Sequence, residues 1–510
     1  MYTEKEYEKH YLLGLDNGGT RIKAVLFDTE GHEISGSSAR TPTENPAPGF
    51  VERDMNDLYT ANQRCIRETI QASGIDAKQI AAIAISGHGK GLYAWGKDGQ
   101  AAYRGIGSSD NRAWCYTERW KKDGTFERNY PKLCQNLVPS QQLALLAWLK
   151  DEKPDIYRKI RWVFPVKDYL RFRLTGEAYC EATDISGSGL FSLRDGCYDR
   201  EMLQDFGIEE IAECLAPIRY SADLCGRITR EAAAVTGLSE GTPVSGGLFD
   251  IDACAVAMHV LSEQDLITIA GTWSINEYIS KTPVLALDPP LMNSLFAIPT
   301  YYLIEDSSAT SAGNLEWFID EFFADSTRPD QDSIYSELEK ELVKSDSSSP
   351  ILIFLPFLFA SNTHPVGKAA FIGLTANSSK TEMLRAMYEG VAFSHRMHVE
   401  RLLSTRKVPD AIRLAGGVCK SEFWVQLFAD VLGMKVETFD VTELGTLGAA
   451  MTAGVTAGLF RDFEEAALHM SHFKSTAYPD PLKTKIYDRK YAVYKKCCEA
   501  LNPVWPEMVV

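Results

Sequence analysis

The stretch Leu12–Asp28, LLGLDNGGTRIKAVLFD, shapes the interpretation of the whole chain. Two β-rich runs flank an Asn17-Gly18-Gly19 turn, and this pattern predicts a β-hairpin because glycine supplies the positive φ that tight turns require. Such a turn leaves backbone N–H groups pointing into open space, where they suit phosphate oxygens. Asp16, at the end of the first run, could hold Mg²⁺ through the water molecules that this ion retains. The alternative is a surface hairpin in which Asp16 caps its own turn.

A second stretch has the same form. Leu266–Ile279, LITIAGTWSINEYI, contains an apolar run, a small turn at Gly271 and Thr272, and a second run. Two phosphate-type hairpins roughly half a chain apart suggest two similar domains on either side of a nucleotide. We place the domain boundary near residue 252, so the predicted domains are residues 1–252 and 253–510.

Composition excludes several classes of protein. The chain has 510 residues and a formal net charge of -16, which argues against nucleic acid as a partner because phosphate backbones are bound mainly through Lys and Arg. Its 11 cysteines are odd in number and lack CxxC spacing, as expected for reduced thiols in the cytosol. No signal peptide is visible, and the longest apolar run, residues 351–360, is too short to span a bilayer. We therefore expect a cytoplasmic protein without membrane contact.

A third glycine-rich stretch follows a predicted strand at residues 80–86. It reads Gly87-His88-Gly89-Lys90-Gly91, which is not a GxGxxG fingerprint, and the chain has no GxxxxGK[ST] motif. A Rossmann dinucleotide site and a P-loop are therefore both disfavoured. The stretch does place His88 and Lys90 at a strand end, where ligands of α/β proteins commonly bind. A plain glycine turn is the alternative.

Two more polar clusters lie in the first half of the chain. Residues 107–112, GSSDNR, include Asp110 just before a predicted helix. Such clusters suit polyol recognition, although most are helix caps. In residues 242–252, TPVSGGLFDID, Asp250 follows a strand that ends at Gly246-Gly247 and precedes an apolar helix. Asp250 is either a general base at a site or the N-cap of that helix.

The second half contains two further glycine-marked turns. Gly313-Asn314 precedes an aromatic helix, and a strand near residue 412 ends at Gly416-Gly417. A double glycine before a helix lets the backbone approach a flat or phosphorylated ligand closely. Ser421 is the predicted N-cap of the next helix. Small residues at 443–454 predict a helix that packs closely beside the same ligand.

The predicted helix at residues 381–403 carries two histidines, His395 and His398, three positions apart. Histidines with this spacing can bind a metal when a carboxylate accompanies them. No carboxylate at a fitting spacing is evident, so we interpret the pair as packing or surface residues.

In combination these motifs resemble the FGGY family of carbohydrate kinases, and the similarity extends from Leu12 to about Gly458. The motifs that carry it are LGLDNGGTRIKAVLFD (13–28), VKDYLRFRLTG (166–176), GGLFD (246–250), AGTW (270–273), AGGVCKSEFWVQLFADVLG (415–433) and ELGTLGAA (443–450). Within the family the chain is most similar to the L-xylulose kinases, through GKGL at 89–92 and SSDNRA at 108–113. The resemblance implies an α/β fold with two actin-like ATPase (ribonuclease H-like) domains facing across a cleft.

The resemblance also implies a role for each matching position. Asp16 would organise Mg²⁺ near the transferred phosphoryl group, and Asp250 would accept the proton of the sugar hydroxyl. The ATP site would comprise Asp16, Gly18, Thr20, Lys23, Gly271, Thr272, Asn314, Gly416, Gly417 and Ser421. The sugar side would comprise His88, Gly89, Lys90, Asp110 and Asp250.

The implied activity is phosphorylation of a primary hydroxyl of a ketopentose, L-xylulose or D-xylulose, with ATP and Mg²⁺ as cofactors. Alternatives are a kinase for another sugar or polyol (ribulose, glycerol, erythritol or gluconate type) and a non-catalytic sugar or nucleotide sensor. The sensor is disfavoured because Asp16 and Asp250 are both present. Gly19, Leu145 and Ile251 depart from the usual family residues, and the last two leave the identity of the sugar open. The oligomeric state, for which a homodimer is one option, is open as well.

Overall fold

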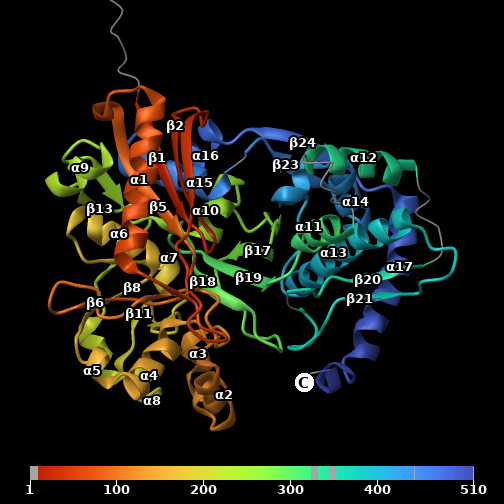
Figure 1. Ribbon diagram of the computed structural model, residues 1–510, viewed down its shortest axis with the longest axis horizontal. Helices are drawn as coiled ribbons and strands as arrows, with labels where there is room; N and C mark the ends of the chain where they lie inside the picture. Colours follow the sequence, from red (N-terminus) through yellow and green to blue (C-terminus); the bar gives the residue numbers. More distant parts are fainter. Residues whose placement is uncertain (1–9, 323–330, 345–350, 360, 442, 509–510) are drawn as a thin grey trace, which may run out of the picture. The chain divides into compact units, whose positions relative to one another are not determined.

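The computed structural model describes residues 10–322, 331–344, 351–359, 361–441 and 443–508 (Figure 1). The chain forms two compact units, each assembled from separate segments. The first comprises the chain up to Leu261, Ile279–Ile304 and Val441–His472. The second comprises Ser262–Tyr278, Glu305–Asp440 and the chain from Phe473 onward. The chain therefore passes between the units more than once, whereas the sequence predicts one boundary, which falls inside helix α10 (Asp250–Ala257).

The first unit contains a seven-stranded mixed sheet. In spatial order its strands are β13 (Leu224–Arg227), β14 (Pro243–Ser245), β5 (Ile80–Gly87), β1 (Tyr11–Asn17), β2 (Arg21–Asp28) and β3 (Glu33–Arg40), with β15 (Leu248–Phe249) beside β5. β1 and β2 form the predicted hairpin, in which Asp16 pairs with Lys23. β5 runs parallel to β1 and places Ser86 beside Asp16, and β15 runs parallel to β5 and places Phe249 beside Gly87. Because these parallel strands end at the same edge of the sheet, their terminal residues lie near one another.

Two helices pack against this sheet. α1 (Met55–Ser73) packs against β2 and β3, and α15 (Leu444–Thr456) packs against β1 and β5. The approach of α15 depends on glycine, since a Cβ atom at Gly14 would lie 1.9 Å from the carbonyl oxygen of Thr446. Likewise a Cβ atom at Gly448 would lie 2.1 Å from the carbonyl oxygen of Ala253. This close packing explains why α15 belongs to the first unit despite its place late in the chain.

Shorter elements complete the first unit. Its remaining helices are α2 (Trp114–Lys122), α3 (Thr125–Leu133), α4 (Gln142–Glu152), α5 (Pro154–Tyr157), α6 (Val166–Thr175), α7 (Ala182–Ile185), α8 (Arg200–Asp205), α9 (Arg230–Thr236) and α16 (Phe463–Met470). Its remaining strands are β4 (Glu52–Arg53), β6 (Tyr93–Gly96), β7 (Gly105–Ile106), β8 (Ile160–Phe164), β9 (Cys180–Glu181), β10 (Phe191–Ser192), β11 (Cys197–Tyr198), β12 (Ile218–Arg219) and β18 (Met292–Leu295). A cluster of buried residues between α2, α4 and α8 forms a core separate from that of the sheet.

The second unit repeats the central motif of the first. Its sheet runs in the order β19 (Tyr302–Ser308), β17 (Ser274–Ser280), β16 (Ile267–Ala270), β22 (Ile412–Ala415), β23 (Val436–Phe439) and β24 (Phe473–Ala477). β16 and β17 form an antiparallel hairpin, and β22 runs parallel to β16. The order β17-β16-β22 therefore matches β2-β1-β5, as the two similar hairpin sequences predict.

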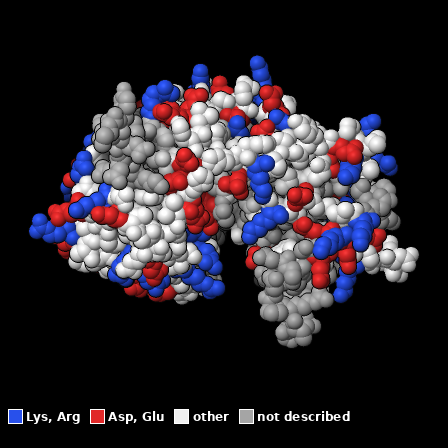
Figure 2. All heavy atoms as spheres, turned by 90° about the horizontal axis from the view of Figure 1, so that it is seen from above, with Lys and Arg blue, Asp and Glu red and all other residues white. Residues whose placement is uncertain are grey.

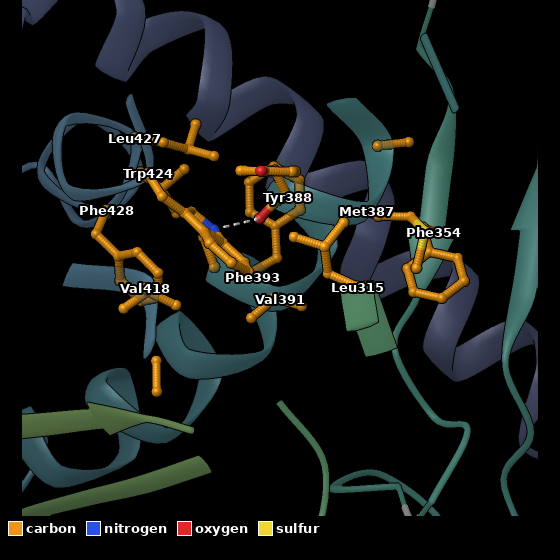
Figure 3. Packing of buried hydrophobic residues seen from close by; sticks show 14 of the residues in the cluster. Leu315, Phe354, Met387, Tyr388, Val391, Phe393, Val418, Trp424, Leu427 and Phe428 are labelled. Carbon is orange, nitrogen blue, oxygen red and sulfur yellow. Dashed lines mark hydrogen bonds between the residues drawn. The ribbon is translucent and has the colours of Figure 1, made fainter. Parts of the chain in front are cut away.

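The core of the second unit is rich in aromatic residues (Figure 3). The helices around it are α11 (Gly313–Phe322), α12 (Gln331–Lys344), α13 (Lys380–Leu403), α14 (Glu422–Leu432) and α17 (Pro481–Leu501), with strands β20 (Ile353–Leu355) and β21 (Ala370–Ile372). The rings of Tyr388 and Trp424 pack 4.3 Å apart, and the Trp424 indole N–H donates to the Tyr388 carbonyl oxygen at 3.4 Å. This pair fixes α14 against α13.

Charged side chains of both signs are interspersed over the face shown in Figure 2. Exposed ion pairs on the described surface include Lys150 with Glu210, 2.8 Å apart. Within the described part of the chain, no helix combines the length and the apolar character needed to cross a membrane.

Candidate active site

The hairpin of the first unit presents one carboxylate at its turn. Asp16 is half-buried at the end of β1 and accepts a hydrogen bond of 2.9 Å from the Ser86 hydroxyl. Gly19 and Thr20 are exposed, and the Gly18 N–H donates to the Arg21 carbonyl oxygen at 3.0 Å, which closes the turn. The backbone of this turn is therefore exposed beside the Asp16 carboxylate.

The surroundings of Asp16 alter its acidity. Burial raises the pKa of Asp16 to about 6, while the Ser86 hydrogen bond and the charge of Lys23 limit the rise. The carboxyl is thus mostly ionised at pH 7 and would gain from a cation. Oxygen donors such as this carboxylate and the neighbouring hydroxyl suit Mg²⁺, so the residues fit the predicted metal.

Helix α15 begins beside the same carboxylate. A Cβ atom at Gly445 would lie 2.9 Å from the carboxyl carbon of Asp16, so only glycine fits there. Glu443, just before the helix, pairs with Lys23 at 2.5 Å. The predicted phosphate ligand Lys23 is therefore held by a carboxylate in this state, and the N-terminal end of α15 adds partial positive charge next to Asp16.

Asp250 is the first residue of α10, half-buried at the end of β15. Phe249 occupies the N-cap position, so the alternative in which Asp250 is the N-cap is wrong. The Phe249 N–H donates to the Thr183 hydroxyl at 2.9 Å, and that hydroxyl donates to Glu181 at 2.7 Å. The position of Asp250 is thereby tied to a buried polar network.

That network contains several charges with almost no exposure. The Lys167 ammonium lies 3.0 Å from Asp168, 3.2 Å from Glu181 and 3.7 Å from Asp184. Burial raises the pKa of Asp184 well above its usual value, and Asp250 contributes to this rise through charge repulsion. The acids of this network thus outnumber its cations, which favours the protonated form of Asp184.

His88 is buried, and both of its ring nitrogens have protein partners. Nε2 accepts a hydrogen bond of 2.8 Å from Arg53 Nη1, which leaves the proton on Nδ1 for the Gly89 carbonyl oxygen at 3.2 Å. Burial and the Arg53 charge lower the pKa of His88 to about 3, so the ring is neutral. A direct hydrogen bond from His88 to a sugar would require the release of one of these partners.

Lys90 and Gly89 lie at the end of β5. Lys90 is half-buried with a φ of 62°, a backbone conformation that few residues other than glycine adopt. A Cβ atom at Gly89 would lie 2.5 Å from the Phe249 ring, so glycine lets this ring lie against the backbone. Phe249, which precedes the predicted base Asp250, therefore lies against the segment predicted to bind the sugar.

Both carboxylate oxygens of Asp110 accept hydrogen bonds from the protein itself. Its two oxygens accept hydrogen bonds from the Arg112 side chain at 2.9 and 2.8 Å, from the Arg112 N–H at 2.9 Å and from the Val51 N–H at 2.7 Å. Arg112 also pairs with Glu52 at 2.9 Å. This arrangement favours a structural role for Asp110, and its contact with a sugar stays a prediction.

We expect Asp110→Asn to lower the free energy of unfolding by about 3–5 kcal/mol, because it breaks a buried ion pair and leaves Arg112 undercompensated. Urea unfolding would measure the change. Asp54→Asn, which keeps a capping side chain at the start of α1, serves as the control and should change stability by less than about 1 kcal/mol. Equal stability of the two variants would contradict the structural role.

The second unit contains a cavity of about 370 Å³ beside its hairpin turn. It is lined by Gly271, Thr272, Ala312, Gly313, Leu315, Glu316, Tyr335, Gly417, Lys420 and Trp424. Gly416, at a φ of 97°, leaves no room for a side chain, since a Cβ atom there would lie 2.4 Å from the Ala270 carbonyl oxygen. The two predicted glycine turns, at 271–272 and 416–417, thus come together at one cavity.

Two predicted nucleotide residues have local roles instead of lining this cavity. Ser421 caps α14 by accepting a hydrogen bond of 3.0 Å from the Trp424 N–H, as the sequence predicts. Asn314 is fully buried, and its amide donates to the Thr310 hydroxyl and to the Ser311 carbonyl oxygen, both at 2.8 Å. Both residues shape the cavity through the helices that they hold.

The histidine pair on α13 is buried in the second unit. His395 lies 2.8 Å from the Ser311 hydroxyl and 3.1 Å from the Ser274 hydroxyl. His398 lies 3.0 Å from Asp306 and 3.0 Å from the Ser308 hydroxyl. Their ring nitrogens therefore bind neighbouring side chains, which agrees with the packing interpretation. Among the described residues, the group with metal-ligand spacing is Asp28, Glu30 and His32, an exposed cluster.

Comparison with protein-family models decides the family. Residues 11–257 match the N-terminal domain of the FGGY family of carbohydrate kinases, and residues 266–457 match its C-terminal domain. The chain belongs to the FGGY family of carbohydrate kinases. As a carbohydrate kinase it is a phosphotransferase with an alcohol group as acceptor, and membership of this family implies the use of ATP.

Individual relatives of this FGGY kinase match along nearly their full length. The L-xylulose/3-keto-L-gulonate kinase of Escherichia coli is 36% identical over 492 residues, which cover 96% of this chain and 97% of that protein. The probable L-xylulose kinase of Haemophilus influenzae is 37% identical over 501 residues, covering 97% and 99%. The crystal structure of a ligand-bound xylulose kinase from Lactobacillus acidophilus superposes with a TM-score of 0.89 at 25% identity, covering 98% and 99%.

Some contacts of this FGGY kinase were not predicted from sequence. Arg53 lies 35 residues from His88 in sequence, and no local pattern links the two. Ser86 ends the strand predicted at residues 80–86, but its pairing with Asp16 depends on β5 running parallel to β1. Glu443 and Gly445 lie in a motif that carries the family resemblance, yet their contact with the first hairpin depends on the fold of the whole unit.

Proposed function

We propose that this kinase transfers the γ-phosphoryl group of ATP, with Mg²⁺, to a primary hydroxyl of a ketopentose, L-xylulose or D-xylulose. The observation that carries the proposal is the register around β5. Asp16 pairs across to Ser86 on one side of this strand, and Phe249, just before Asp250, pairs across to Gly87 on the other. Asp16, the proposed metal ligand, and Asp250, the proposed base, therefore lie at the same edge of one sheet.

Phosphoryl transfer needs positioning and charge neutralisation more than covalent help from the protein. In our proposal Asp250 accepts the proton of the attacking hydroxyl, held in place through the Phe249 contact with Thr183. Asp16 would hold Mg²⁺, which neutralises charge on the transferring phosphoryl group. The exposed turn at Gly19 and Thr20 offers backbone N–H groups to the phosphates.

The second unit would bind the rest of the nucleotide. Gly271 and Thr272 occupy the turn equivalent to the first phosphate turn, and they share a cavity with Gly417 and Trp424. Glycine backbone suits phosphates, and the aromatic wall suits a flat base. Gly416 contributes by fixing the turn rather than by its own contact.

The names of the relatives support the choice of sugar. The E. coli relative is named for L-xylulose and 3-keto-L-gulonate, and the H. influenzae relative for L-xylulose. A panel of ketopentoses, polyols, aldonates and keto-acids, assayed for ADP release, would test the choice through kcat/KM. The proposal requires the highest value for a xylulose, and a higher value for glycerol, ribulose or gluconate would replace the substrate while leaving the kinase assignment intact.

We expect Lys90→His to change the ratio of kcat/KM for L-xylulose over D-xylulose by about ten-fold or more, because a polar group at the sugar that loses its partner hydroxyl costs about 1–3 kcal/mol. Steady-state kinetics with both sugars measure the ratio. Lys78→His, an exposed lysine before β5, is the matched control and should leave the ratio unchanged. An unchanged ratio in Lys90→His would remove Lys90 from the sugar site.

A further inference from the structure

Arg53 is an arginine that the sequence does not single out. It ends β4 with 2% of its surface exposed. Nη1 donates to His88 Nε2 at 2.8 Å and to the Tyr93 hydroxyl at 2.9 Å, and Nη2 donates to the Gly19 carbonyl oxygen at 2.8 Å. Its guanidinium therefore bridges the first phosphate turn and the strand end that carries His88.

All three acceptors of this guanidinium are uncharged. The Nε atom is buried without a hydrogen-bond partner among the described residues. A guanidinium has five N–H groups, of which three donate here, so two remain without an acceptor in the described structure. No Asp or Glu oxygen of the described residues lies within 4.0 Å of Arg53.

Two acidic residues close to β4, Glu52 and Asp110, are already paired with arginines. Glu52 binds Arg112 at 2.9 Å and Arg104 at 3.2 Å, and Asp110 binds Arg112 at 2.8 Å. Buried charges in proteins are normally paired, because removing a charge from water is strongly unfavourable. Arg53 departs from this pattern, whereas Arg112 follows it.

A second cation adds to the local positive charge. Lys90 has no ion-pair partner among the described residues, and its charge acts on His88 together with that of Arg53. His88 itself is neutral because burial and these cations hold its pKa at about 3. Among the described residues, Arg53 and Lys90 therefore have no carboxylate within ion-pair distance, and the nearby Asp16 accepts its hydrogen bond from Ser86 instead.

We propose that Arg53 supplies the positive charge for an oxyanion of the bound reactants, either the carboxylate of a sugar acid or the transferring phosphoryl group. The proposal rests on the proposed function in one respect, namely that sugar and phosphate meet beside these residues. A planar guanidinium binds carboxylate and phosphate oxygens through paired N–H donors, and two of the donors of Arg53 are unused. The bound substrates then supply the anion that balances the charge of Arg53.

The test compares Arg53→Gln and Arg53→Lys with the wild-type protein on an uncharged sugar, L-xylulose, and on a carboxylated one, 3-keto-L-gulonate. If the anion is the sugar carboxylate, Arg53→Gln lowers kcat/KM for the keto-acid about 10- to 100-fold and leaves L-xylulose within about three-fold. If it is the phosphoryl group, kcat falls by a similar factor with both sugars while the sugar KM is kept. Lysine should restore part of either loss, because it keeps the charge.

Thermal unfolding separates this role from a structural one. Arg112→Gln is the matched control, because it removes a buried arginine that has carboxylate partners. We expect a clear loss of Tm in that variant and a smaller loss in Arg53→Gln, because the glutamine amide can still donate to one of the three neutral acceptors and no buried carboxylate loses its partner. A Tm loss in Arg53→Gln equal to that of the control, or full activity with both sugars, would overturn the proposal.

A binding experiment keeps the outcome independent of the proposed function. Inorganic phosphate and 3-keto-L-gulonate are added separately to the wild-type protein and to Arg53→Gln, and Tm is recorded. The proposal predicts that at least one of them raises the Tm of the wild-type protein and that the rise disappears in the variant. Equal rises in both proteins, or no rise in the wild type, would refute it even if the kinase phosphorylates its sugar normally. If no sugar is phosphorylated, the proposed function fails and this comparison still decides the role of Arg53.

Discussion

The variant Asp250→Asn is expected to lose about 10²- to 10⁴-fold in kcat and to bind ATP and sugar nearly as well as the wild-type protein. An amide of the same shape keeps the contacts of the side chain but cannot accept the hydroxyl proton. Asp250 is the first residue of α10, with Phe249 at the N-cap position, and asparagine fits the same place in the helix. Single-turnover kinetics at saturating ATP and sugar would measure the loss, and calorimetry would measure the affinities.

The control for this variant is Asp462→Asn. Asp462 caps α16 through a hydrogen bond of 2.9 Å from the Glu465 N–H, a role that asparagine can also fill. It should keep wild-type kcat. Turnover of Asp250→Asn within a few-fold of wild type would show that another group accepts the proton.

For Asp16→Ala we expect a loss of about 10²-fold or more in Mg²⁺-dependent kcat/KM, with sugar affinity nearly unchanged, because this carboxylate acts on the metal–phosphate unit. The folded protein should be as stable or more stable, since burial already disfavours the charged form of Asp16. Kinetics at several Mg²⁺ concentrations and calorimetric titration with sugar alone are the measurements. Asp28→Ala, at the other end of the hairpin, is the control. Equal loss of sugar binding would place Asp16 elsewhere in the site.

The raised pKa of Asp16 gives a pH dependence with a defined sign. Its carboxyl gains a proton as the pH falls through about 6, and the neutral form binds a cation poorly. We therefore expect kcat/KM to fall on the acid side. Since Mg²⁺ and the proton compete for the carboxylate, the apparent pKa should move to lower pH as the Mg²⁺ concentration rises. A pKa that is independent of Mg²⁺ would point to a different titrating group.

The two hairpins could be predicted from sequence because their signal is local. An apolar run, a glycine turn and a second run fix a hairpin by short-range geometry, and both copies at Leu12–Asp28 and Leu266–Ile279 fold that way. The two hairpins and their glycine turns could therefore be located from the sequence before the fold was known. The common sheet edge of Asp16 and Asp250 was not predicted, because it depends on β1 and β15 both pairing with β5.

The division of the chain into two units could not be predicted from local sequence in this way. Gly14 lets α15 approach β1 and Gly448 lets it approach α10, and the sequence around neither glycine identifies its partner. The sequence predicted a small-residue helix beside the ligand of the Gly416-Gly417 turn, whereas α15 packs against β1 and β5 in the first unit. Interleaved segments depend on such long-range contacts, which no periodicity encodes.

The sugar side shows the same limit at the level of single residues. His88 and Asp110 were predicted as sugar contacts from residue type and position, yet each is engaged by a buried arginine, Arg53 or Arg112. Arg112 stands two residues from Asp110, and that spacing was a usable signal for an ion pair. No sequence signal identified the partners of Arg53, because they come together only when the sheet forms.

The most direct test of the central claim is product analysis by ³¹P NMR after incubation of the kinase with ATP, Mg²⁺ and L-xylulose or D-xylulose. We expect a sugar phosphomonoester that appears in equal amount with ADP, and the loss of both signals in Asp250→Asn. ADP accompanied by inorganic phosphate alone, or a phosphomonoester formed at the wild-type rate by Asp250→Asn, would contradict it.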